Sequence, residues 1–375
     1  MDRRGFLGTA AAALLTGCAA RRITVAPPGP LPPALAPVEV TPRRVIRTVC
    51  GLRPYRPSGF VVRTEIIGNK PVVHNYGHGG AGITLCWGTA HLAAEEALRA
   101  GQTDAAVLGC GAVGLATART LQRRGFSVTI YTKDTPPDTT SNIAGGYWSP
   151  VTLFDRARAT PAFLDQYERA ARIAHRFYQN MVGDYYGVRW LPMYQFGQEP
   201  IRSFEPGSAR ARIAGLFPDA HELAPGEHPF PAAHVLRFYA MLIEPPVFLN
   251  AVLRDFLLQG GRLVIRQLET PMDAVSLPHP IIVNCTGLGS HALFGDQELT
   301  PVKGQLSFLP PDPRIDYMTI GMDHGTYMFP RHDGILLGGT HEEGNWSLEP
   351  DEEAKARILA EHARVFGSFA RRKGV

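Results

Sequence analysis

The sequence predicts an α/β protein with a largely parallel sheet and a second, mixed or antiparallel sheet. A short apolar strand is expected at 104–108, and the glycine pattern GCGAVG follows it at once at 109–114. An amphipathic helix is then expected over 113–124, and a second strand over 127–131. A G-x-G-x-x-G pattern placed between a strand and a helix is typical of a Rossmann-like dinucleotide-binding unit.

Each glycine of this pattern has a separate expected role. Gly109 makes the tight turn, Gly111 lets a pyrophosphate approach the backbone, and Gly114 lets the helix pack against the strand. At the end of the second strand stand Lys133 and Asp134, roughly 20 residues downstream, where a group for the adenosine ribose is expected. The alternative for this pair is a solvated surface ion pair.

The composition is that of a globular protein with two domains. The chain has 375 residues, of which 45% are hydrophobic and 19% charged, and its net charge is +4. The basic residues are not grouped into runs, which argues against nucleic-acid binding. Four cysteines are scattered without C-x-x-C spacing and are interpreted as buried thiols: Cys50, Cys86, Cys110 and Cys285.

The N-terminal segment resembles an export signal. Arg3-Arg4 precede an apolar run over 5–17, which is too short to span a bilayer. The run ends in LTGC, a lipoprotein-like cleavage box in which Cys18 is the lipidated residue; simple signal-peptidase cleavage is the alternative. Residues 1–18 are therefore the predicted signal and 19–43 a proline-rich tether. We expect an exported bacterial protein on the periplasmic or cell-surface side, anchored to a membrane without spanning it.

The stretch 72–88 (VVHNYGHGGAGITLCWG) predicts a strand, a glycine-rich loop and a helix. Dense glycines let the backbone approach a ligand closely, and the amides at a helix start suit an electron-rich group. His74 and His78 are interpreted as structural histidines, so no metal site is predicted. A hydroxyl cluster at 139–141 can likewise cap a helix or bind a phosphate.

Seven segments together resemble the D-amino-acid oxidases, within the FAD-dependent amine oxidoreductases. These are 51–57 (GLRPYRP), 74–88, 107–118, 136–148, 283–289 (VNCTGLG), 302–306 (VKGQL) and 327–346. The resemblance covers nearly all of the mature chain. It implies an FAD-binding domain at 72–160 and 246–304, and a substrate domain at 44–71, 161–245 and 305–375.

The order of these segments differs from the family's order. There, the glycine-motif strand comes first, and the GLRP and HNYGHGG segments close the chain; here these two segments precede the motif. The last helix, expected at 351–366, resembles the segment that leads into GLRP. A circular permutation would produce this order, with the old ends joined near 101–103. An assembly artefact is the alternative.

The resemblance implies three residues at the reaction centre. Arg53 would bind the substrate carboxylate, with a structural ion pair as the alternative; Arg56 is less favoured. Tyr327 would reach the same carboxylate through its hydroxyl, unless it is a core residue. The carbonyl of Gly80 would accept a hydrogen bond from the substrate amine, with no side-chain base.

The resemblance also implies the FAD contacts. They are Gly79, Gly82, Ile83 and Thr84 at the isoalloxazine, Gly109, Cys110, Gly111 and Gly114 at the pyrophosphate, Lys133, Asp134 and Leu268 at the adenosine, and Thr139, Thr140, Ser141, Gly145, Gly146 and Thr286 along the remainder. Eukaryotic relatives carry a second active-site tyrosine four residues before the first. Here that position is Asp323, and it stays open whether Tyr317 substitutes for it.

The implied activity is oxidative deamination of a D-amino acid, by hydride transfer from Cα to flavin N5. The imino acid hydrolyses to a 2-oxo acid and ammonia, and O2 is reduced to H2O2. The alternatives are a glycine- or sarcosine-type amine oxidase, a quinone-linked D-amino-acid dehydrogenase, and a flavin-loaded binding lipoprotein. His234, Arg237 and Arg331 are candidates for admitting acidic substrates. The oligomeric state stays open, with a homodimer as one option.

Overall fold

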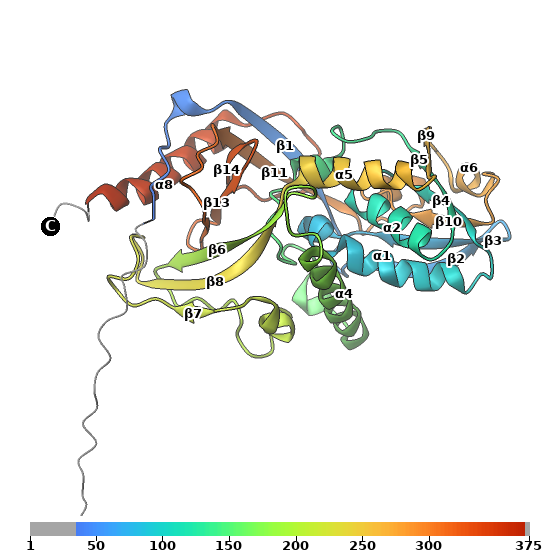
Figure 1. The fold of residues 1–375 in the computed structure, drawn as a ribbon, viewed down its shortest axis with the longest axis horizontal. Helices are drawn as coiled ribbons and strands as arrows, with labels where there is room; N and C mark the ends of the chain where they lie inside the picture. Colours follow the sequence, from blue (N-terminus) through green and yellow to red (C-terminus); the bar gives the residue numbers. More distant parts are fainter. Residues whose placement is uncertain (1–34, 372–375) are drawn as a thin grey trace, which may run out of the picture. The chain divides into compact units, whose positions relative to one another are not determined.

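The structure is a computed structural model that describes residues 35–371. Two β-sheets organise this part of the chain (Figure 1). The first sheet has six strands, in the order β2 (Val61–Ile67), β3 (Lys70–Tyr76), β10 (Ile281–Asn284), β4 (Asp104–Leu108), β5 (Ser127–Thr132) and β9 (Arg262–Ile265). From β3 to β9 all neighbours are parallel, and β2 pairs antiparallel with β3. This confirms the predicted parallel sheet.

The apolar composition of the central strands explains their place. Every residue of β10 is buried, and four of the five residues of β4 are. Parallel strands covered on both faces have continuous apolar sequences of this kind. β3 precedes β4 in the sequence but lies on the far side of β10, so the stretch 72–88 enters the same sheet as the glycine motif.

Helices cover this sheet. The longer ones are α1 (Gly82–Leu98), α2 (Ala112–Arg123), α4 (Pro161–Gln179) and α5 (Pro245–Leu258), and the short ones are α3 (Thr140–Ile143), α6 (Pro271–Val275) and α7 (Gly289–Leu293). α2 packs between α1 and α5, and Figure 1 shows these three helices over one face of the sheet. α1 is apolar nearly all round because it is enclosed by the sheet, α2 and α4.

The second sheet is mixed, as predicted. Its strands are, in order, β1 (Arg47–Tyr55), β11 (Thr300–Leu309), β14 (Gly334–Gly338), β13 (Thr326–Arg331), β12 (Met318–Gly321), β6 (Val188–Gly197), β8 (His234–Ile243) and β7 (His221–Glu222), with β15 (Glu342–Glu343) also on β11. Its neighbours are antiparallel except for the parallel pair of β12 and β6. β1 pairs with β11 over its whole length.

Prolines do not exclude the stretch 191–238 from this sheet. Most of β6 and the start of β8 lie in it, although prolines are typical of loops. These two strands pair over ten residues, including Pro192 opposite Tyr239. Pairing with a distant strand overrides the local signal of a proline.

The predicted tether is too long at its C-terminal end. Val38 is 4% exposed and lies in a core cluster with Ile358 and Phe366 of α8 (Glu352–Arg371). Residues 35–43 therefore pack on the protein, because their apolar side chains complete this cluster. The export motif, Cys18 and the rest of the tether lie outside the described residues and stay predictions. Within 35–371, no helix combines the length and the apolar character that a membrane crossing requires.

The segment 44–71 is divided between the two sheets. β2 comes from the range assigned to the substrate domain, but it pairs with β3 at the edge of the six-stranded sheet. The segment 44–71 thus contributes one strand to each sheet, β1 to the second and β2 to the first. This connection places the end of β1 next to the loop that follows β3.

Candidate active site

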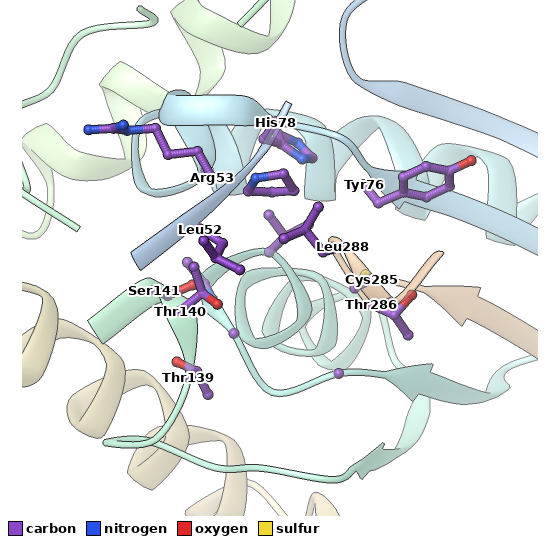
Figure 2. A pocket seen from close by; sticks show the side chains of 18 of the residues that line it. Leu52, Arg53, Tyr76, His78, Thr139, Thr140, Ser141, Cys285, Thr286 and Leu288 are labelled. Carbon is purple, nitrogen blue, oxygen red and sulfur yellow. The ribbon is translucent and has the colours of Figure 1, made fainter. Parts of the chain in front are cut away.

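A cavity of about 710 Å³ is lined by residues of both sheets. Its walls come from β1, from the loop between β3 and α1, from the turn after β4, and from the segments 131–145 and 285–293. Figure 2 shows Thr139, Thr140 and Ser141 on one side, with Cys285 and Thr286 on the other. The glycine motif and the predicted carboxylate anchor therefore open into one continuous space.

The turn after β4 is suited to a pyrophosphate. Gly109 has φ +102°, and a Cβ there would lie 2.7 Å from the carbonyl oxygen of Cys285. Gly111 is the N-cap of α2 and provides no capping side chain, while Ser141 Oγ accepts from the Ala112 amide at 3.0 Å. A glycine turn at a helix N-terminus presents backbone N–H groups to an anion.

The thiols beside this turn are inert. Burial raises the pKa of Cys110 and of Cys285 to about 12. Both thiols therefore stay protonated near neutral pH, and a protonated thiol is a poor nucleophile. They serve here as small apolar lining, which agrees with their interpretation as buried thiols.

The segment after β5 forms another part of the wall. Lys133 and Asp134 make an exposed ion pair at 3.5 Å and both line the cavity, as does Leu268. Tyr131 was missed by the sequence analysis. Its hydroxyl lies 3.2 Å from Nε2 of His279, and Nδ1 of that ring lies 3.0 Å from Asp104, so the phenol is fixed in place.

His78 in the glycine-rich loop is a buried neutral imidazole. Its Nε2 lies 2.8 Å from Thr89 Oγ1, and its ring stacks on Phe60 with centroids 5.4 Å apart. Burial lowers the pKa of His78 to about 3. His74 instead hydrogen-bonds with Asn284 at 3.1 Å. Each histidine thus has a partner within the protein.

Gly79 and Gly80 are held against the loop that contains Thr152. The Gly80 amide donates to the Thr152 carbonyl at 2.9 Å, and a Cβ on Gly79 would lie 2.0 Å from that oxygen. Thr152 has φ +51°, a conformation that a β-branched residue rarely adopts. A Cβ on Gly80 would lie 3.5 Å from Arg53 Cδ, so the two predicted reaction-centre residues are neighbours.

Arg53 has an unused hydrogen-bonding nitrogen. Its Nη2 donates to Tyr327 Oη at 3.4 Å, whereas Nη1 is buried and has no hydrogen-bond partner within 35–371. A buried donor without a partner is unfavourable, and a carboxylate is the ligand that a guanidinium matches best. Arg56 is occupied, since its Nε donates to Asp296 at 3.0 Å and its other end pairs with Glu298. The geometry therefore favours Arg53 over Arg56 as the anchor.

Comparison with protein families identifies the group to which this chain belongs. The profile of the family described as "FAD dependent oxidoreductase" matches residues 31–96 and 104–374. The chain belongs to this family. It is 33% identical to a D-amino-acid oxidase of Streptomyces coelicolor over 260 residues, which are 68% of this chain and 75% of that protein. It is 30% identical to the human D-aspartate oxidase over 263 residues, covering 68% and 73% of the two chains.

Two solved structures share the fold of this chain. The L-proline dehydrogenase from P. horikoshii superposes with a TM-score of 0.55 at 16% identity, covering 72% of this chain and 78% of that one. The glycine oxidase from Geobacillus kaustophilus gives a TM-score of 0.53 at 16% identity, covering 72% and 80%. The protein is an FAD-dependent amine oxidoreductase.

The residues present fit FAD. A Cβ at Gly111 would lie 3.0 Å from Ser141 Oγ. Glycine therefore leaves space for a ligand between this turn and Ser141, beside the start of α2. Of the predicted reaction-centre and FAD residues, all line the cavity except Thr84, Gly114 and Gly146. We expect the lining residues of the glycine motif and of 139–141 to hold the pyrophosphate of FAD and the adjoining parts of the cofactor.

The three exceptions have packing roles. A Cβ on Gly114 would lie 2.0 Å from the Gly109 carbonyl oxygen, and one on Gly146 would lie 1.9 Å from that of Ile243. Thr84 is buried, and its hydroxyl donates to the Ser149 carbonyl at 3.1 Å. For Gly114 this is the predicted packing of helix on strand. For Thr84 and Gly146 the expected cofactor contact stays a prediction.

Two further expectations are decided by the geometry. Tyr317 is fully buried, and its hydroxyl donates to the Ala36 carbonyl at 2.6 Å, so it does not replace the second active-site tyrosine. Asp323 accepts from the Gln198 amide at 3.1 Å. The candidates for acidic substrates each pair with an acid away from the cavity lining: His234 with Glu222, Arg237 with Asp219 and Arg331 with Asp333.

The sequence analysis missed several lining residues. Among them are Leu52, Pro54, Asn75, Tyr76, Tyr131, Arg266, Leu288, His291, Gly304, Leu306, Trp346 and Leu348. Most lie inside segments that carried the family resemblance, next to residues that were singled out. The family resemblance therefore marked these segments. The pairing of distant strands is needed to show which residues of each segment face the cavity.

The buried state of His78 predicts a pH dependence of stability. The folded pKa of about 3 lies below the ordinary value of about 6.5, so the unfolded chain binds the extra proton between these values. The free energy of unfolding should therefore fall as the pH drops from about 6.5 toward 3. The contribution of one such group reaches about 1.4 kcal/mol per pH unit.

A His78→Gln variant should remove this contribution, because glutamine keeps an N–H donor for Thr89 and does not titrate. Urea unfolding of the holoprotein at several pH values between 7 and 4.5 measures it. We expect a shallower decrease in the variant than in the wild type, and an unchanged decrease in the surface control His221→Gln. Equal slopes for His78→Gln and the wild type would contradict the assignment.

Proposed function

We propose that this protein oxidises D-amino acids and binds their carboxylate between Arg53 and Tyr327. The buried, unpartnered Nη1 of Arg53 beside the Tyr327 hydroxyl carries this proposal. The curated relatives named D-amino-acid oxidase at about 30% identity support it. When bound, FAD accepts the hydride that leaves the substrate Cα.

The chain's own residues orient the substrate for this step. Arg53 and the Tyr327 hydroxyl hold the carboxylate, and the neighbouring Gly80 carbonyl accepts from the amine. Among the described lining residues, the only carboxylates are Asp134 and Asp138. Both lie in the segment after β5, which is expected to contact the nucleotide part of FAD. No carboxylate base is therefore supplied beside Arg53, and the amine must reach the site neutral.

The overall reaction balances with O2 and water as co-reactants. The amino acid loses a hydride and a proton and becomes an imino acid, which water hydrolyses to a 2-oxo acid and ammonia. O2 takes up the two electrons with two protons and leaves as H2O2. A quinone in place of O2 would make the protein a dehydrogenase, and an achiral substrate would make it a glycine-type oxidase.

Replacing Arg53 tests the anchor. Arg53→Met should raise KM for D-amino acids by about two to three orders of magnitude, since losing one partner of a buried charge pair costs roughly 3–5 kcal/mol. Arg53→Lys should recover only part of the loss, because an ammonium cannot bind a carboxylate bidentately. Oxygen consumption with a panel of D- and L-amino acids, glycine and sarcosine measures this.

The exposed Arg99→Met variant is the matched control and should behave as the wild type. Unchanged kinetics in Arg53→Met would show that the anchor is wrong. Turnover of glycine or sarcosine in preference to every D-amino acid would favour the alternative oxidase. Turnover with an artificial acceptor but without O2 consumption would favour the dehydrogenase.

We also propose that the chain is a circular permutant of its family. The family profile matches two segments, and the gap between them at 97–103 includes the predicted junction. Residues 35–45 pack on α8, so the C-terminal helix and the segment leading into β1 share one core cluster. These two ends are the ones that the family order would connect.

A chain rebuilt in the family order tests this proposal. Residues 104–371 followed by a short glycine-serine linker and residues 35–101 should fold and bind FAD with the absorption spectrum of the native chain. The contacts are preserved and only the connection changes. Absorbance of the purified holoprotein and its thermal midpoint are the readouts. A rebuilt chain that fails to retain FAD would contradict the proposal.

A further inference from the structure

Two glycines of the second sheet lie directly beneath Arg53 and Tyr327. Gly304 is on β11 and Gly338 is on β14. A Cβ on Gly304 would lie 2.5 Å from Arg53 Nη2 and 2.7 Å from its Cζ. A Cβ on Gly338 would lie 2.2 Å from Tyr327 Cζ and 2.5 Å from its Oη. Real Cβ atoms do not approach other atoms this closely.

Strand pairing explains the arrangement. Arg53 pairs with Val302 on β11, and Gly304 lies two residues further along the same face. Tyr327 pairs directly with Gly338, and Gly338 pairs on its other side with Leu306 of β11. Both glycines therefore lie on the sheet face that carries the arginine and the tyrosine.

The backbone does not require glycine at either position. Neither Gly304 nor Gly338 has the positive φ that favours glycine. Gly304 lies inside β11 and Gly338 ends β14, both central strands of the sheet, where glycine weakens the pairing. Glycine is needed at both positions because a side chain there would fill the space above β11 and β14. Arg53 occupies that space with its guanidinium, and Tyr327 occupies it with its ring.

We infer that Gly304 and Gly338 are positioning residues for the carboxylate site, an inference that rests on the proposed function. Gly304 lets the Arg53 guanidinium lie against β11, and Gly338 lets the Tyr327 ring lie against β14. Together they hold the 3.4 Å contact between Nη2 and Oη and leave Nη1 for the substrate. Each acts through the side chain above it and touches no reacting atom.

The two positions differ in how much their neighbours can move. The guanidinium is the far end of a flexible side chain, so an alanine at 304 would displace it without disturbing the strand. The Tyr327 ring is stacked on Phe329 with centroids 5.1 Å apart, and Phe329 is itself close to Gly145. Gly304→Ala is therefore the cleaner test, and Gly338→Ala is expected to cost more stability.

The test uses the FAD-loaded protein and two readouts. Benzoate, a carboxylate with no Cα–H to oxidise, is titrated against the flavin absorbance, and KM and kcat are measured with a D-amino acid. Gly304→Ala should weaken benzoate binding and raise KM by roughly ten- to a hundredfold, with FAD retained, because a displacement of about 1 Å is enough for such a loss. Gly215→Ala is the control, since a Cβ there meets nothing within 4 Å.

Coupling to Arg53 separates positioning from a general structural role. In an Arg53→Met background, Gly304→Ala should cause no additional loss, since the clash has been removed. If Gly304→Ala alone does not retain FAD, recovery in the Arg53→Met background still supports the inference. Failure in both backgrounds, or wild-type benzoate binding by Gly304→Ala, would overturn it.

The outcomes also separate this inference from the proposed function. A wild-type protein that binds benzoate but oxidises no D-amino acid would contradict the function, while the benzoate measurements would still test Gly304. A wild-type protein that oxidises D-amino acids, with a Gly304→Ala variant of equal KM, would contradict only the positioning role.

Discussion

The site depends on the half-buried guanidinium of Arg53, whose Nη1 is buried and has no hydrogen-bond partner within 35–371. Removing a cation from water costs several kcal/mol unless a partner compensates, and the 3.4 Å contact with Tyr327 compensates only in part. The protein tolerates this because β1 is paired along its whole length with β11, which fixes Arg53 in the wall of the cavity. A substrate carboxylate would supply the missing partner.

A second set of contacts, at Asp296, ties the two sheets together. Arg56, the residue that follows β1, donates to Asp296, and the hydroxyl of Tyr76 at the end of β3 donates to the same carboxylate at 2.8 Å. The end of β1 is thereby tied to the start of the glycine-rich loop. Gly80 is placed beside Arg53 by this tie and by its bond to Thr152, so the sheet that carries the glycine-motif turn also brings the proposed acceptor for the amine to the anchor.

Local chemistry was predictable from the sequence, and long-range pairing was not. The turn at 109–114 was found because glycines, strand and helix are adjacent in the chain. Arg53 and Arg56 could not be separated by residue type alone; the structure separates them because only Arg56 has acidic partners. Gly304 and Gly338 carry no local signal, since their importance comes from side chains on other strands. Pro192 likewise gives no local sign of a strand, and it lies in β6 because β6 pairs with β8.

The most direct test of the account is an anaerobic titration of the FAD-loaded protein with enantiomeric pairs of amino acids. The flavin absorbance should bleach with D-amino acids and persist with the L-enantiomers at the same concentrations, because the carboxylate and amine contacts fix which face of Cα presents its hydrogen. A flavin that stays yellow with every D-amino acid, or that bleaches equally with both enantiomers, would contradict the account.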